Sequence, residues 1–352
     1  MSEVIRLGIL SFAHDHAHFW ARTINDLSDA TLAGIWDDDA GRGVDAAREH
    51  DTTFVPDLGR LLERCDAVGI TSPTAQHASL IEAAARAGVH VLCEKPLATS
   101  LAEGDRIARA IAASGIVFMQ QFPKRFDPVN ERLAALVHGG ELGAITLVRI
   151  RHGHAHGLDT LWGSRWYADP ALSGGGTLLD EGIHAADLLR WLLGEPISVH
   201  ATIGHTLGLA VEDTATATFR FPTGAIAEVA TGWGFLAAEQ SVEVYGTQGC
   251  ATLSGVDLAS RDVARPPYLR VFRRGDTPGA WQSSPLTPCF MAGGATFHGE
   301  GVRRFIACLE QGTAPPVGLA DGRRALAMIA AAYRAAETGT TQMITSTTGE
   351  TN

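Results

Sequence analysis

Long apolar runs, basic stretches and paired cysteines are all missing from this chain of 352 residues. No apolar run approaches the roughly 20 residues that a membrane-spanning helix needs. A formal net charge of -11, together with the lack of basic runs, argues against nucleic acid or an anionic membrane as a partner. The five cysteines show neither a pairing pattern nor a CxxC spacing, which predicts free thiols in a reducing cytoplasm. They are Cys65, Cys93, Cys250, Cys289 and Cys308.

We also expect no signal peptide, because an apolar strand pattern begins at Val4 and leaves no room for a leader. We therefore expect a cytoplasmic protein. With 45% apolar and 19% charged residues, the composition is that of a soluble globular protein. A length of 352 residues suits about two domains.

Short apolar strands alternate with helical stretches in residues 1–121, which predicts an α/β Rossmann domain with a doubly wound parallel sheet. Its strands are expected at Val4–Leu10, Thr31–Trp36, Ala67–Ile70, Val89–Cys93 and Ile116–Met119. Residues 122–352 contain runs of strands with period-2 alternation and few helices, which predicts an α+β domain with a mostly antiparallel sheet. Its strands are expected at Ile145–Ile150, Ile197–Ile203, Thr214–Phe221, Ala225–Ala230, Val242–Tyr245 and Tyr268–Phe272, and its last helix at about 322–338.

The first turn lacks the glycines of a dinucleotide-binding fingerprint. Where that fingerprint has Gly-x-Gly-x-x-Gly, this chain has Ser11-Phe12-Ala13-His14-Asp15-His16. Ser11 and Ala13 are small enough for close backbone approach to a pyrophosphate, whereas His16 is expected to push the following helix away from the strand. Asp37 ends the second strand, where a carboxylate binds a ribose diol and, with no cation beside it, repels a 2′-phosphate. NAD is therefore favoured over NADP, with an ordinary acidic turn as the alternative.

The stretch Ser173–Gly194 contains three glycines followed by what reads as a single, uninterrupted helix. Asp180, His184 and Asp187 fall at i, i+4 and i+7, which predicts that they share one face of this helix. Asp187 is expected to bridge Arg190. Asp180 and His184 are either a satisfied core pair or a functional pair.

The sequence Glu94-Lys95-Pro96 directly follows the expected strand Val89–Cys93. Charges just past the carboxyl end of a parallel strand lie where open α/β sheets bind their ligands. This second group of charged residues favours the functional interpretation of Asp180 and His184.

Two groups of three histidines stand out: His14, His16 and His18, and His152, His154 and His156. At the loop-to-helix junction of the first group, residues i and i+2 are not expected to face each other. In a strand, alternate residues share a face, so the three side chains of the second group could project from one face and bind a metal ion together. Because no thiolate or carboxylate has a matching spacing, we expect no metal. The second group is expected either to continue the face of Val148 and Ile150 and bind a hydroxyl-rich ligand, or to form an exposed loop.

Several motifs follow one another along almost the whole chain: Thr71-Ser-Pro-Thr-Ala-Gln-His77, Glu94-Lys95-Pro96, Arg125-Phe126-Asp127-Pro128, Gly174-Gly-Gly with Asp180-x-Gly182-x-His184-x-x-Asp187, and a closing helix from Asp321 to Gly339. In this order they resemble the motifs of the Gfo/Idh/MocA oxidoreductases. The resemblance implies a Rossmann domain and a second domain with a large open sheet that mediates dimers or tetramers. It also implies NAD(P)-dependent oxidation or reduction of a sugar, polyol or related hydroxyl compound. The chain departs from the family's glycine-rich turn at Ser11, Ala13 and His16. This departure bears on how the cofactor is held and not on the fold.

The resemblance, carried over residue by residue, implies that Lys95 contacts the nicotinamide region and the substrate, Asp180 orients the substrate, and His184 is the acid/base. Cofactor contacts are expected from Ser11, Phe12, Ala13, His14, Asp37, Ser72, Pro73, His77, Glu94, Lys95 and Lys124. Substrate contacts are expected from Lys95, Arg125, His154, Trp166, Asp180 and His184.

These residue types suit alcohol oxidation. A histidine with a pKa near 7 takes the hydroxyl proton as hydride leaves, and a lysine stabilises the developing alkoxide. Trp162, Trp166 and Tyr167 form either a wall for a sugar ring or part of the core. Two other hypotheses are a catalytically silent sensor that binds sugar or dinucleotide on the same fold, and a metal-dependent hydrolase that uses the histidines.

Overall fold

The computed structural model describes residues 4–289 and 297–344, which form two compact units. The first unit contains residues 4–123, 171–174 and 298–323, and the second contains the other described residues. The expected domains, 1–121 and 122–352, differ from these units because residues 171–174 and 298–323 lie in the first. In the described ranges, no helix has both the length and the apolar character needed to cross a membrane.

A parallel sheet with the strand order β2-β1-β3-β4-β5 forms the centre of the first unit. Its strands are β1 (Ile5–Leu10), β2 (Ala30–Trp36), β3 (Ala67–Ile70), β4 (His90–Cys93) and β5 (Phe118–Gln120). Every residue of β3 and β5 is buried, as expected for a parallel sheet that is covered on both faces. The predicted doubly wound Rossmann architecture is thereby confirmed.

The helices of the first unit begin where short polar side chains cap them. Asp39, Asp57 and Ser100 each accept the backbone N–H of the residue three positions on. The helices are α1 (His16–Asn25), α2 (Ala40–Glu49), α3 (Leu58–Leu62), α4 (His77–Arg86), α5 (Leu101–Ser114) and most of α11 (Phe297–Gln311). Helix α1 differs, because its N-cap residue, Asp15, makes no side-chain capping bond.

Helix α11 belongs to the first unit although it lies far along the chain. The side-chain amide of Gln121 donates to the carbonyl of His298 at 3.0 Å. A Cβ on Gly301 would lie 2.1 Å from Gln121 Oε1, and a Cβ on Gly299 would lie 2.4 Å from Thr23 Oγ1. The glycines of α11 therefore let this helix pack closely on the rest of the first unit. No local pattern in the sequence predicts this packing.

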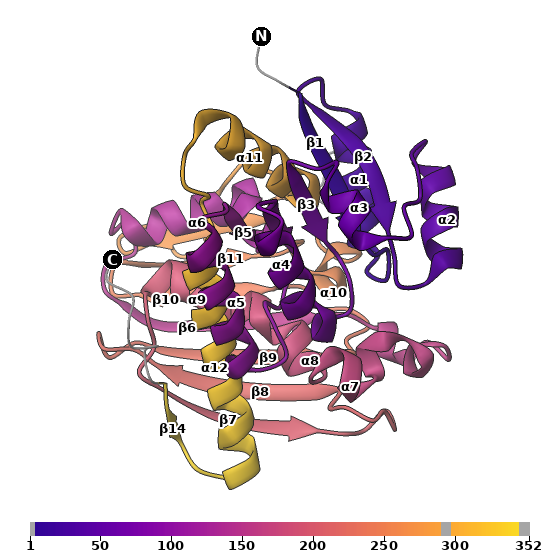
Figure 1. Cartoon of the computed structure of the whole chain (residues 1–352). Coiled ribbons are helices and arrows are strands. Elements are labelled where there is room, and N and C mark those ends of the chain that lie inside the picture. The colour runs from indigo at the N-terminus through magenta and orange to yellow at the C-terminus, as the bar shows by residue number, and fades with distance from the viewer. Residues whose placement is uncertain (1–3, 290–296, 345–352) are drawn as a thin grey trace. The chain divides into compact units, whose positions relative to one another are not determined.

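The second unit contains, in its described part, a nine-stranded sheet with the order β13-β12-β11-β10-β6-β9-β8-β7-β14 (Figure 1). Its neighbouring strands are antiparallel except for β6 and β9, so the predicted mostly antiparallel sheet is confirmed. In β8, the buried Ala215, Ala217 and Phe219 alternate with exposed residues. The strands are β6 (Ile145–Gly153), β7 (Ser198–Gly204), β8 (Thr214–Arg220), β9 (Ile226–Gly232), β10 (Val242–Gly246), β11 (Gly249–Leu253), β12 (Leu269–Arg273), β13 (Gln282–Ser283) and β14 (Gln342–Met343).

Several elements of the second unit were not predicted, and the longest of them are β11 and α6. Strand β11 begins with small residues that carry little strand propensity. Helix α6 (Pro128–His138) does have start signals, since Asp127 caps it and Pro128 is its first residue. The other helices here are α7 (Pro170–Ser173, mostly in the first unit), α8 (Thr177–Asp180), α9 (Gly182–Leu193), α10 (Leu258–Arg261) and α12 (Leu319–Thr338), and short 3₁₀ turns include η3 (His156–Leu158), η4 (Trp162–Ser164) and η5 (Trp166–Ala168).

The glycines before α8 allow a close approach by Glu212. The Glu212 carboxylate accepts the N–H groups of Gly176 and Leu178, both at 2.9 Å, and caps the first turn of α8. A Cβ on Gly176 would lie 1.9 Å from the Glu212 carbonyl oxygen, and a Cβ on Gly175 would lie 2.3 Å from the hydroxyl of Tyr333. That hydroxyl also donates to Glu212, at 2.7 Å. This cap fixes the start of the segment that carries Asp180.

Candidate functional site

The expected site residues fall into two groups, one in each unit. Ser11, Asp37, Thr71 and Glu94 directly follow β1, β2, β3 and β4, so the first group lies at the carboxyl edge of the parallel sheet. This group consists of Ser11, Phe12, Ala13, His14, Asp37, Ser72, Pro73, His77, Glu94 and Lys95. The second unit contains Lys124, Arg125, His154, Trp166, Asp180 and His184.

The turn after β1 has a left-handed backbone without glycine. Ser11 has a φ of 75°, in the region that glycine ordinarily supplies at such a turn. Four N–H groups of the turn are bonded within the protein: that of Phe12 to Asp37 at 2.7 Å, that of Ala13 to Oγ of Ser11 at 3.2 Å, that of His14 to the carbonyl of Thr71 at 3.1 Å, and that of His16 to Nδ1 of His14 at 3.2 Å. The turn therefore keeps a dinucleotide-type backbone while its own side chains use part of its hydrogen-bonding capacity.

The side chain of His16 lies over the edge of the sheet. Its Nδ1 is 2.6 Å from Oε1 of Glu94. Helix α1 packs on the sheet through Trp20, whose ring lies 2.8 Å from the position of a Cβ on Gly69. His16 was expected to push the helix away from the strand; its ring points instead along the edge, outside the helix–sheet contact.

Asp37 ends β2 as expected, but it has a cationic partner. Nε and Nη2 of Arg42 donate to its carboxylate at 2.9 and 2.6 Å, and Nη2 also lies 2.7 Å from Asp38. The expectation that no cation accompanies Asp37 is wrong, because the first turn of α2 folds Arg42 back onto the end of β2. Burial and the Asp37 carboxylate act in opposite directions on the pKa of Arg42, and the net effect is to raise it.

His77 joins the turns that follow β3 and β4. Its Nδ1 lies 2.9 Å from the carbonyl oxygen of Pro96, and its Nε2 lies 3.1 Å from that of Ser72. Burial lowers the pKa of His77, so the ring is neutral near pH 7 and donates one of these two bonds. His77 thus positions two turns, and contacts of Ser72, Pro73 and His77 with a cofactor stay a prediction.

Glu94 is completely buried, and the side chain of Lys95 follows it into the interior. Oε2 of Glu94 accepts the backbone N–H of Lys95 at 2.7 Å. The sequence contains two lysines, Lys95 and Lys124, and both are about 95% buried. In a chain whose surface cations are arginines, such rare lysines mark sites that need a compact ammonium group. The rarity of lysine is a signal that sequence reasoning missed.

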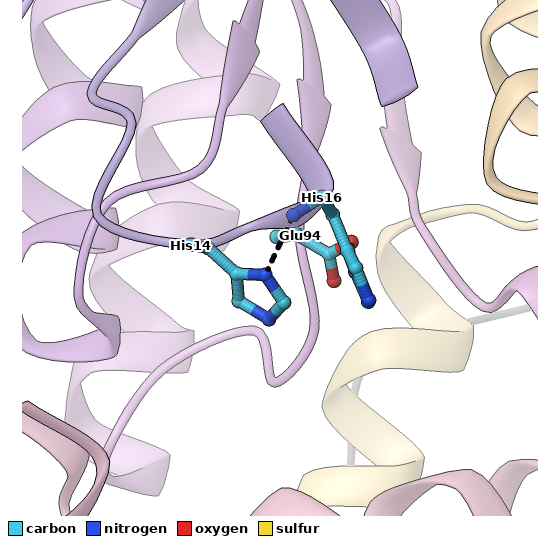
Figure 2. Close-up of side chains that lie close together, drawn as sticks. All are labelled: His14, His16 and Glu94. Carbon is cyan, nitrogen blue, oxygen red and sulfur yellow. Dashed lines mark hydrogen bonds and ion pairs between the residues drawn. The ribbon is translucent and has the colours of Figure 1, made fainter. Parts of the chain in front are cut away.

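Three side chains gather beside the turn that leads into α1: His14, His16 and Glu94 (Figure 2). The ring centroids of His14 and His16 are 4.1 Å apart, and His298 lies against His16 at 3.6 Å. The expectation that these two histidines do not face each other is wrong, because His14 precedes the helix and has no helical geometry. Burial, with His16 as a further cause, lowers the pKa of His14 well below its usual range.

In the second unit, the expected single helix is divided into α8 and α9. The N–H of His184 bonds to the carbonyl of Glu181, three residues back, at 3.2 Å, which is tighter than an α-helical turn. Gly182, a poor helix former, begins α9. Asp180 accepts a hydrogen bond from Nε1 of Trp233 at 3.2 Å. The single helix was a wrong expectation, and Asp180 and His184 lie on different helical segments.

Glu181, at this break, binds two histidines of the second triplet. One of its carboxylate oxygens is 2.5 Å from Nδ1 of His152, and the other is 3.6 Å from Nε2 of His154. Ligand atoms of His154, Asp180 and Glu181 all lie within 4.8 Å of one another. The ring of His184 is 4.9 Å from that of His152. The structure therefore brings His154, Asp180 and His184 together around Glu181 and His152.

His156 does not join this group. Val148, Ile150 and His152 are buried on one face of β6, but the strand ends at Gly153. Beyond that point the side chain of His156 is half exposed and lies 3.5 Å from Asp159. The expected continuation of the strand face is thus correct for His152 and wrong for His156.

Two buried ring nitrogens of this region, Nε2 of His152 and Nε1 of Trp162, have no hydrogen-bond partner within the described ranges. The ring centroid of Trp162 lies 5.3 Å from that of His154, so the indole borders the same group. A buried polar atom without a partner costs about 1–3 kcal/mol. A hydroxyl group, as donor and acceptor, can satisfy both nitrogen types.

The aromatic residues before the glycines pack on one another. Trp162 stacks on Tyr167 at 5.2 Å, and Trp166 stacks on Tyr167 at 3.9 Å. With Trp233, they form a buried cluster of the second unit. These contacts favour the core interpretation for Trp162 and Tyr167, while Trp166 is partly exposed.

Arg125 binds Asp187 through two hydrogen bonds of 2.9 and 2.6 Å. Asp187 was expected to bridge Arg190, which instead binds Glu195 at 2.7 Å. Helical spacing could not predict Arg125 as the partner of Asp187, because the two residues are 62 positions apart in the chain. The role of Arg125 in substrate binding stays a prediction.

Lys124 is held inside the second unit. Its ammonium group donates to the carbonyl of Val256 and lies 4.9 Å from the ring centroid of Phe297. Burial lowers its pKa against the opposing effects of Asp257 and Asp127. Its expected contact with the cofactor also stays a prediction.

Sequence reasoning missed Glu181 as a member of the site and offered His152 only as one of three histidines that could bind a hydroxyl-rich ligand. His152 was noted as part of a triplet, but its carboxylate partner lies 29 residues further on. Glu181 directly follows Asp180, and on a helix it would have pointed elsewhere. The sequence signal that could have revealed Glu181 was Gly182, a poor helix former at the break between α8 and α9.

A parallel sheet with polar residues at its carboxyl edge, combined with a separate unit built on a broad, mostly antiparallel sheet, defines a two-domain oxidoreductase of the Rossmann class. The chain belongs to the GFO/IDH/MocA family. Residues 7–122 match the oxidoreductase family with an NAD-binding Rossmann fold, and residues 130–252 match the GFO/IDH/MocA C-terminal domain.

Similar proteins cover almost the whole chain. Myo-inositol 2-dehydrogenase of Thermotoga maritima is 27% identical over 95% of both chains. D-apiose dehydrogenase of Paraburkholderia graminis is 27% identical over 95% of this chain and 88% of its own. The fold matches that of aldose–aldose oxidoreductase from Caulobacter crescentus, crystallised with glycerol, with a TM-score of 0.82 at 24% identity, covering 96% of this chain and 99% of that one.

Proposed function

We propose that this oxidoreductase transfers a hydride between NAD and a secondary hydroxyl or ketone of a sugar, polyol or related compound. The names of the relatives support this substrate class, since they include inositol, apiose and aldose enzymes. The observation that carries the proposal is the pair of unpartnered buried nitrogens on His152 and Trp162. A ligand with several hydroxyl groups supplies the partners that these atoms lack.

The second unit supplies the proton chemistry in this proposal. His184 takes the hydroxyl proton at a ring nitrogen during oxidation and returns it during reduction. Asp180, whose carboxylate is held by Trp233, accepts a hydrogen bond from the substrate and orients it. The Glu181 carboxylate fixes the ring of His152 through Nδ1, so that Nε2 of His152 is available to a substrate hydroxyl. The assignment of Lys95 to the same reaction, as the cation that stabilises the alkoxide, rests on the family motif Glu94-Lys95-Pro96.

The first unit fits a dinucleotide at its carboxyl edge. The left-handed Ser11 gives the turn after β1 the backbone that such turns need, and Asp37 stands at the position that binds the ribose. Bound NAD accepts or donates the hydride. Ser11, Phe12, Ala13 and His14 line the turn that would hold its phosphates.

We propose that NAD is preferred over NADP, by a smaller margin than an unpaired Asp37 would give. Three consecutive carboxylates, Asp37, Asp38 and Asp39, lie around a single cation, Arg42: its guanidinium donates to Asp37 and Asp38, and its backbone N–H donates to Asp39. Arg42 already binds two of them, so a 2′-phosphate meets a net negative charge.

We also propose that the protein is cytoplasmic and that it forms a homodimer or homotetramer through the sheet of the second unit. One face of β8 is exposed, with Thr216, Thr218 and Arg220 directed outward, and could be covered by a second copy. Light scattering of the purified protein tests the assembly, and a monomer at micromolar concentration would contradict it.

The reaction is tested by titrating the purified protein with NAD and NADH and then screening sugars and polyols for a change in nicotinamide absorbance. We expect NADH binding and turnover of at least one polyhydroxy compound. Binding of NADH or a sugar without turnover of any compound would favour the silent sensor. His205→Gln, a change of an exposed histidine just after β7, is the matched control and should leave the rate unchanged.

A further inference from the structure

His18, Glu49 and His50 form a third histidine–carboxylate group, which joins helix α1 to the end of α2 in the first unit. We propose that these three residues bind one divalent transition-metal ion of the zinc class. Two imidazoles and one carboxylate are a donor set of zinc sites that have three protein ligands and keep a fourth position for water. None of the three residues is among the expected contacts of the cofactor or the substrate. The proposal therefore goes beyond the dehydrogenase reaction and does not depend on it.

The three donor atoms already have the spacing of ligands around one such ion. Nδ1 of His18 lies 3.0 Å from Nε2 of His50 and 3.3 Å from Oε1 of Glu49. The third side of this triangle, from Nε2 of His50 to Oε1 of Glu49, is 3.8 Å long. Zinc bonds of about 2.0–2.2 Å place neighbouring tetrahedral ligands roughly 3.3 Å apart. The observed separations lie on both sides of this value, so small shifts complete the triangle.

Both histidines have a ring nitrogen available for the ion. Nδ1 of His18 and Nε2 of His50 share one proton across their hydrogen bond, and the two nitrogens face each other, with the ring centroids 5.2 Å apart. The opposite nitrogens, Nε2 of His18 and Nδ1 of His50, make no hydrogen bond to any residue that the structure describes. The shared proton can therefore move to the far nitrogen of its own ring, and the ion takes its place. A turn of the partly exposed His18 ring then directs its Nδ1 to the ion.

The surroundings hold His50 in place and leave the other two ligands open to water. The side chain of His50 is 3% exposed, and the side-chain amide of Asn25 donates to its backbone carbonyl at 3.0 Å. The ring of Phe12 lies against both imidazoles, with its centroid 5.0 Å from that of His18 and 5.5 Å from that of His50. Such outer contacts orient metal ligands and raise affinity. The side chains of His18 and Glu49 are 32% and 47% exposed, so solvent can supply the fourth ligand.

The charges near the group are favourable for a cation. Besides Glu49, the carboxylate of Asp51 acts on His50 from the next position in the chain. Nη2 of Arg22 donates to Oε1 of Glu49 at 3.2 Å and competes with an ion for that oxygen. The side chain of Arg22 is 62% exposed, however, and can turn into solvent. Magnesium and calcium need several oxygen ligands, whereas zinc, cobalt and nickel bind imidazole nitrogen well, so two histidines favour the transition metals.

This group differs from the metal site that was considered and rejected in the sequence. That argument looked for a carboxylate with a spacing that matches a histidine triplet. Here only His18 belongs to a triplet, and His50 lies 32 positions further along the chain. Packing of the end of α2 against α1 brings the donors together. The donor set is therefore visible only in the tertiary structure.

The test is a titration of the full-length protein with Co²⁺ at about pH 7.5, where histidine is mostly neutral, after treatment with a chelator and dialysis. Binding is followed by the visible absorption of the ion, and Zn²⁺ is then added in competition. We expect one tightly bound ion per chain, displaced by Zn²⁺. Absence of tight Co²⁺ binding to the wild-type protein would overturn the proposal.

Variants around the group should change the affinity in opposite directions. His18→Gln should weaken binding by on the order of 10²-fold, and Glu49→Gln by about 10-fold, because glutamine keeps an oxygen but loses the charge. Arg22→Gln should strengthen binding several-fold, because the competing cation is removed. The controls are the exposed His205→Gln and, from the neighbouring histidine group, His16→Gln, and both should leave the affinity unchanged.

Circular dichroism shows whether each variant is folded. His18 and Glu49 are partly exposed, so replacing them should leave the core of the first unit intact, and His50→Gln is added as a third ligand variant. Binding that is not weakened by His18→Gln or Glu49→Gln in a folded protein would overturn the proposal. So would binding that disappears with His16→Gln, or an Arg22→Gln variant that binds the ion no more tightly than the wild type.

Discussion

Two histidine–carboxylate groups in this protein share a local pattern but differ in what they leave unsatisfied. Each contains a His-x-His pair, His14 with His16 and His152 with His154, and each receives a carboxylate from elsewhere in the chain. In the first unit the carboxylate is Glu94, which follows a strand. In the second it is Glu181, which lies at a helix break.

The difference concerns the hydrogen-bond partners around each group. In the second unit, Nε2 of His152 and the nearby Nε1 of Trp162 are buried without a partner in the described part of the chain, which points to an organic ligand with hydroxyl groups. In the first unit, His16 and Glu94 satisfy each other's hydrogen-bonding atoms at 2.6 Å. Similar sequence patterns can thus serve different chemistry, depending on what surrounds them.

The largest effect is expected from His184 in the second unit. His184→Gln should lower the rate by about 10²- to 10⁴-fold and remove the acidic limb of the pH profile of kcat/KM, because glutamine cannot transfer the proton. Steady-state rates between about pH 5 and 9 measure both quantities, with His205→Gln as the control. Coinciding pH profiles and similar rates for wild type and variant would make His184 a core residue.

A change at Glu181 separates the two groups more finely. Glu181→Gln should lower kcat/KM about 10- to 100-fold, because a charge-assisted hydrogen bond to His152 is worth about 1.5–3 kcal/mol. Its affinity for NADH should equal that of the wild type, because Glu181 lies in the second unit and most of the expected cofactor contacts lie in the first. An unchanged kcat/KM for Glu181→Gln would show that the contact between Glu181 and His152 does not serve the reaction.

The cofactor preference should respond in opposite directions to two changes at the end of β2. Asp37→Ala should narrow the preference for NAD over NADP several-fold, because one carboxylate near the 2′-phosphate is removed. Arg42→Ala should widen it, since Asp37 and Asp38 lose the cation that both now share. The ratio of kcat/KM for the two cofactors is the measurement. A preference that moves in the same direction in both variants would contradict the ion-pair argument.

The smallest effect concerns acid stability of the first unit. Burial lowers the pKa of His77, so the folded chain leaves this ring neutral, whereas the unfolded chain protonates it near pH 6.5. The free energy of unfolding is therefore at its full value above about pH 7 and falls as the pH drops below about 6.5, with a limiting slope of about 1.4 kcal/mol per pH unit. His14, His50 and His90 act in the same direction, because burial lowers the pKa of each.

Thermal unfolding between about pH 8 and pH 5 measures this dependence. His77→Gln should flatten it, whatever its effect on stability at the alkaline end of that range, and the exposed-residue control His205→Gln should not. An equal slope for wild type and His77→Gln would show that His77 is not among the groups responsible.

Much of the first unit could be predicted from sequence because its signals are local. Strand β3 was placed at its observed bounds, since its buried apolar run lies within the strand itself. Residues 298–323, which include most of helix α11, were instead assigned to the second domain. The packing of this helix against Gln121 depends on small residues that any helix could contain.

The sequence by itself determined the fold class, most of the strands and the residue types of the candidate site. These could be predicted because periodicity and motifs depend on residues that are close together in the sequence. Tertiary structure alone decided the partners: Arg42 for Asp37, Glu94 for His16, Glu181 for His152 and Arg125 for Asp187. The physical reason is the short range of these interactions. A hydrogen bond or ion pair needs its atoms within about 3 Å, and the spacing of residues along the chain does not report such distances across a fold.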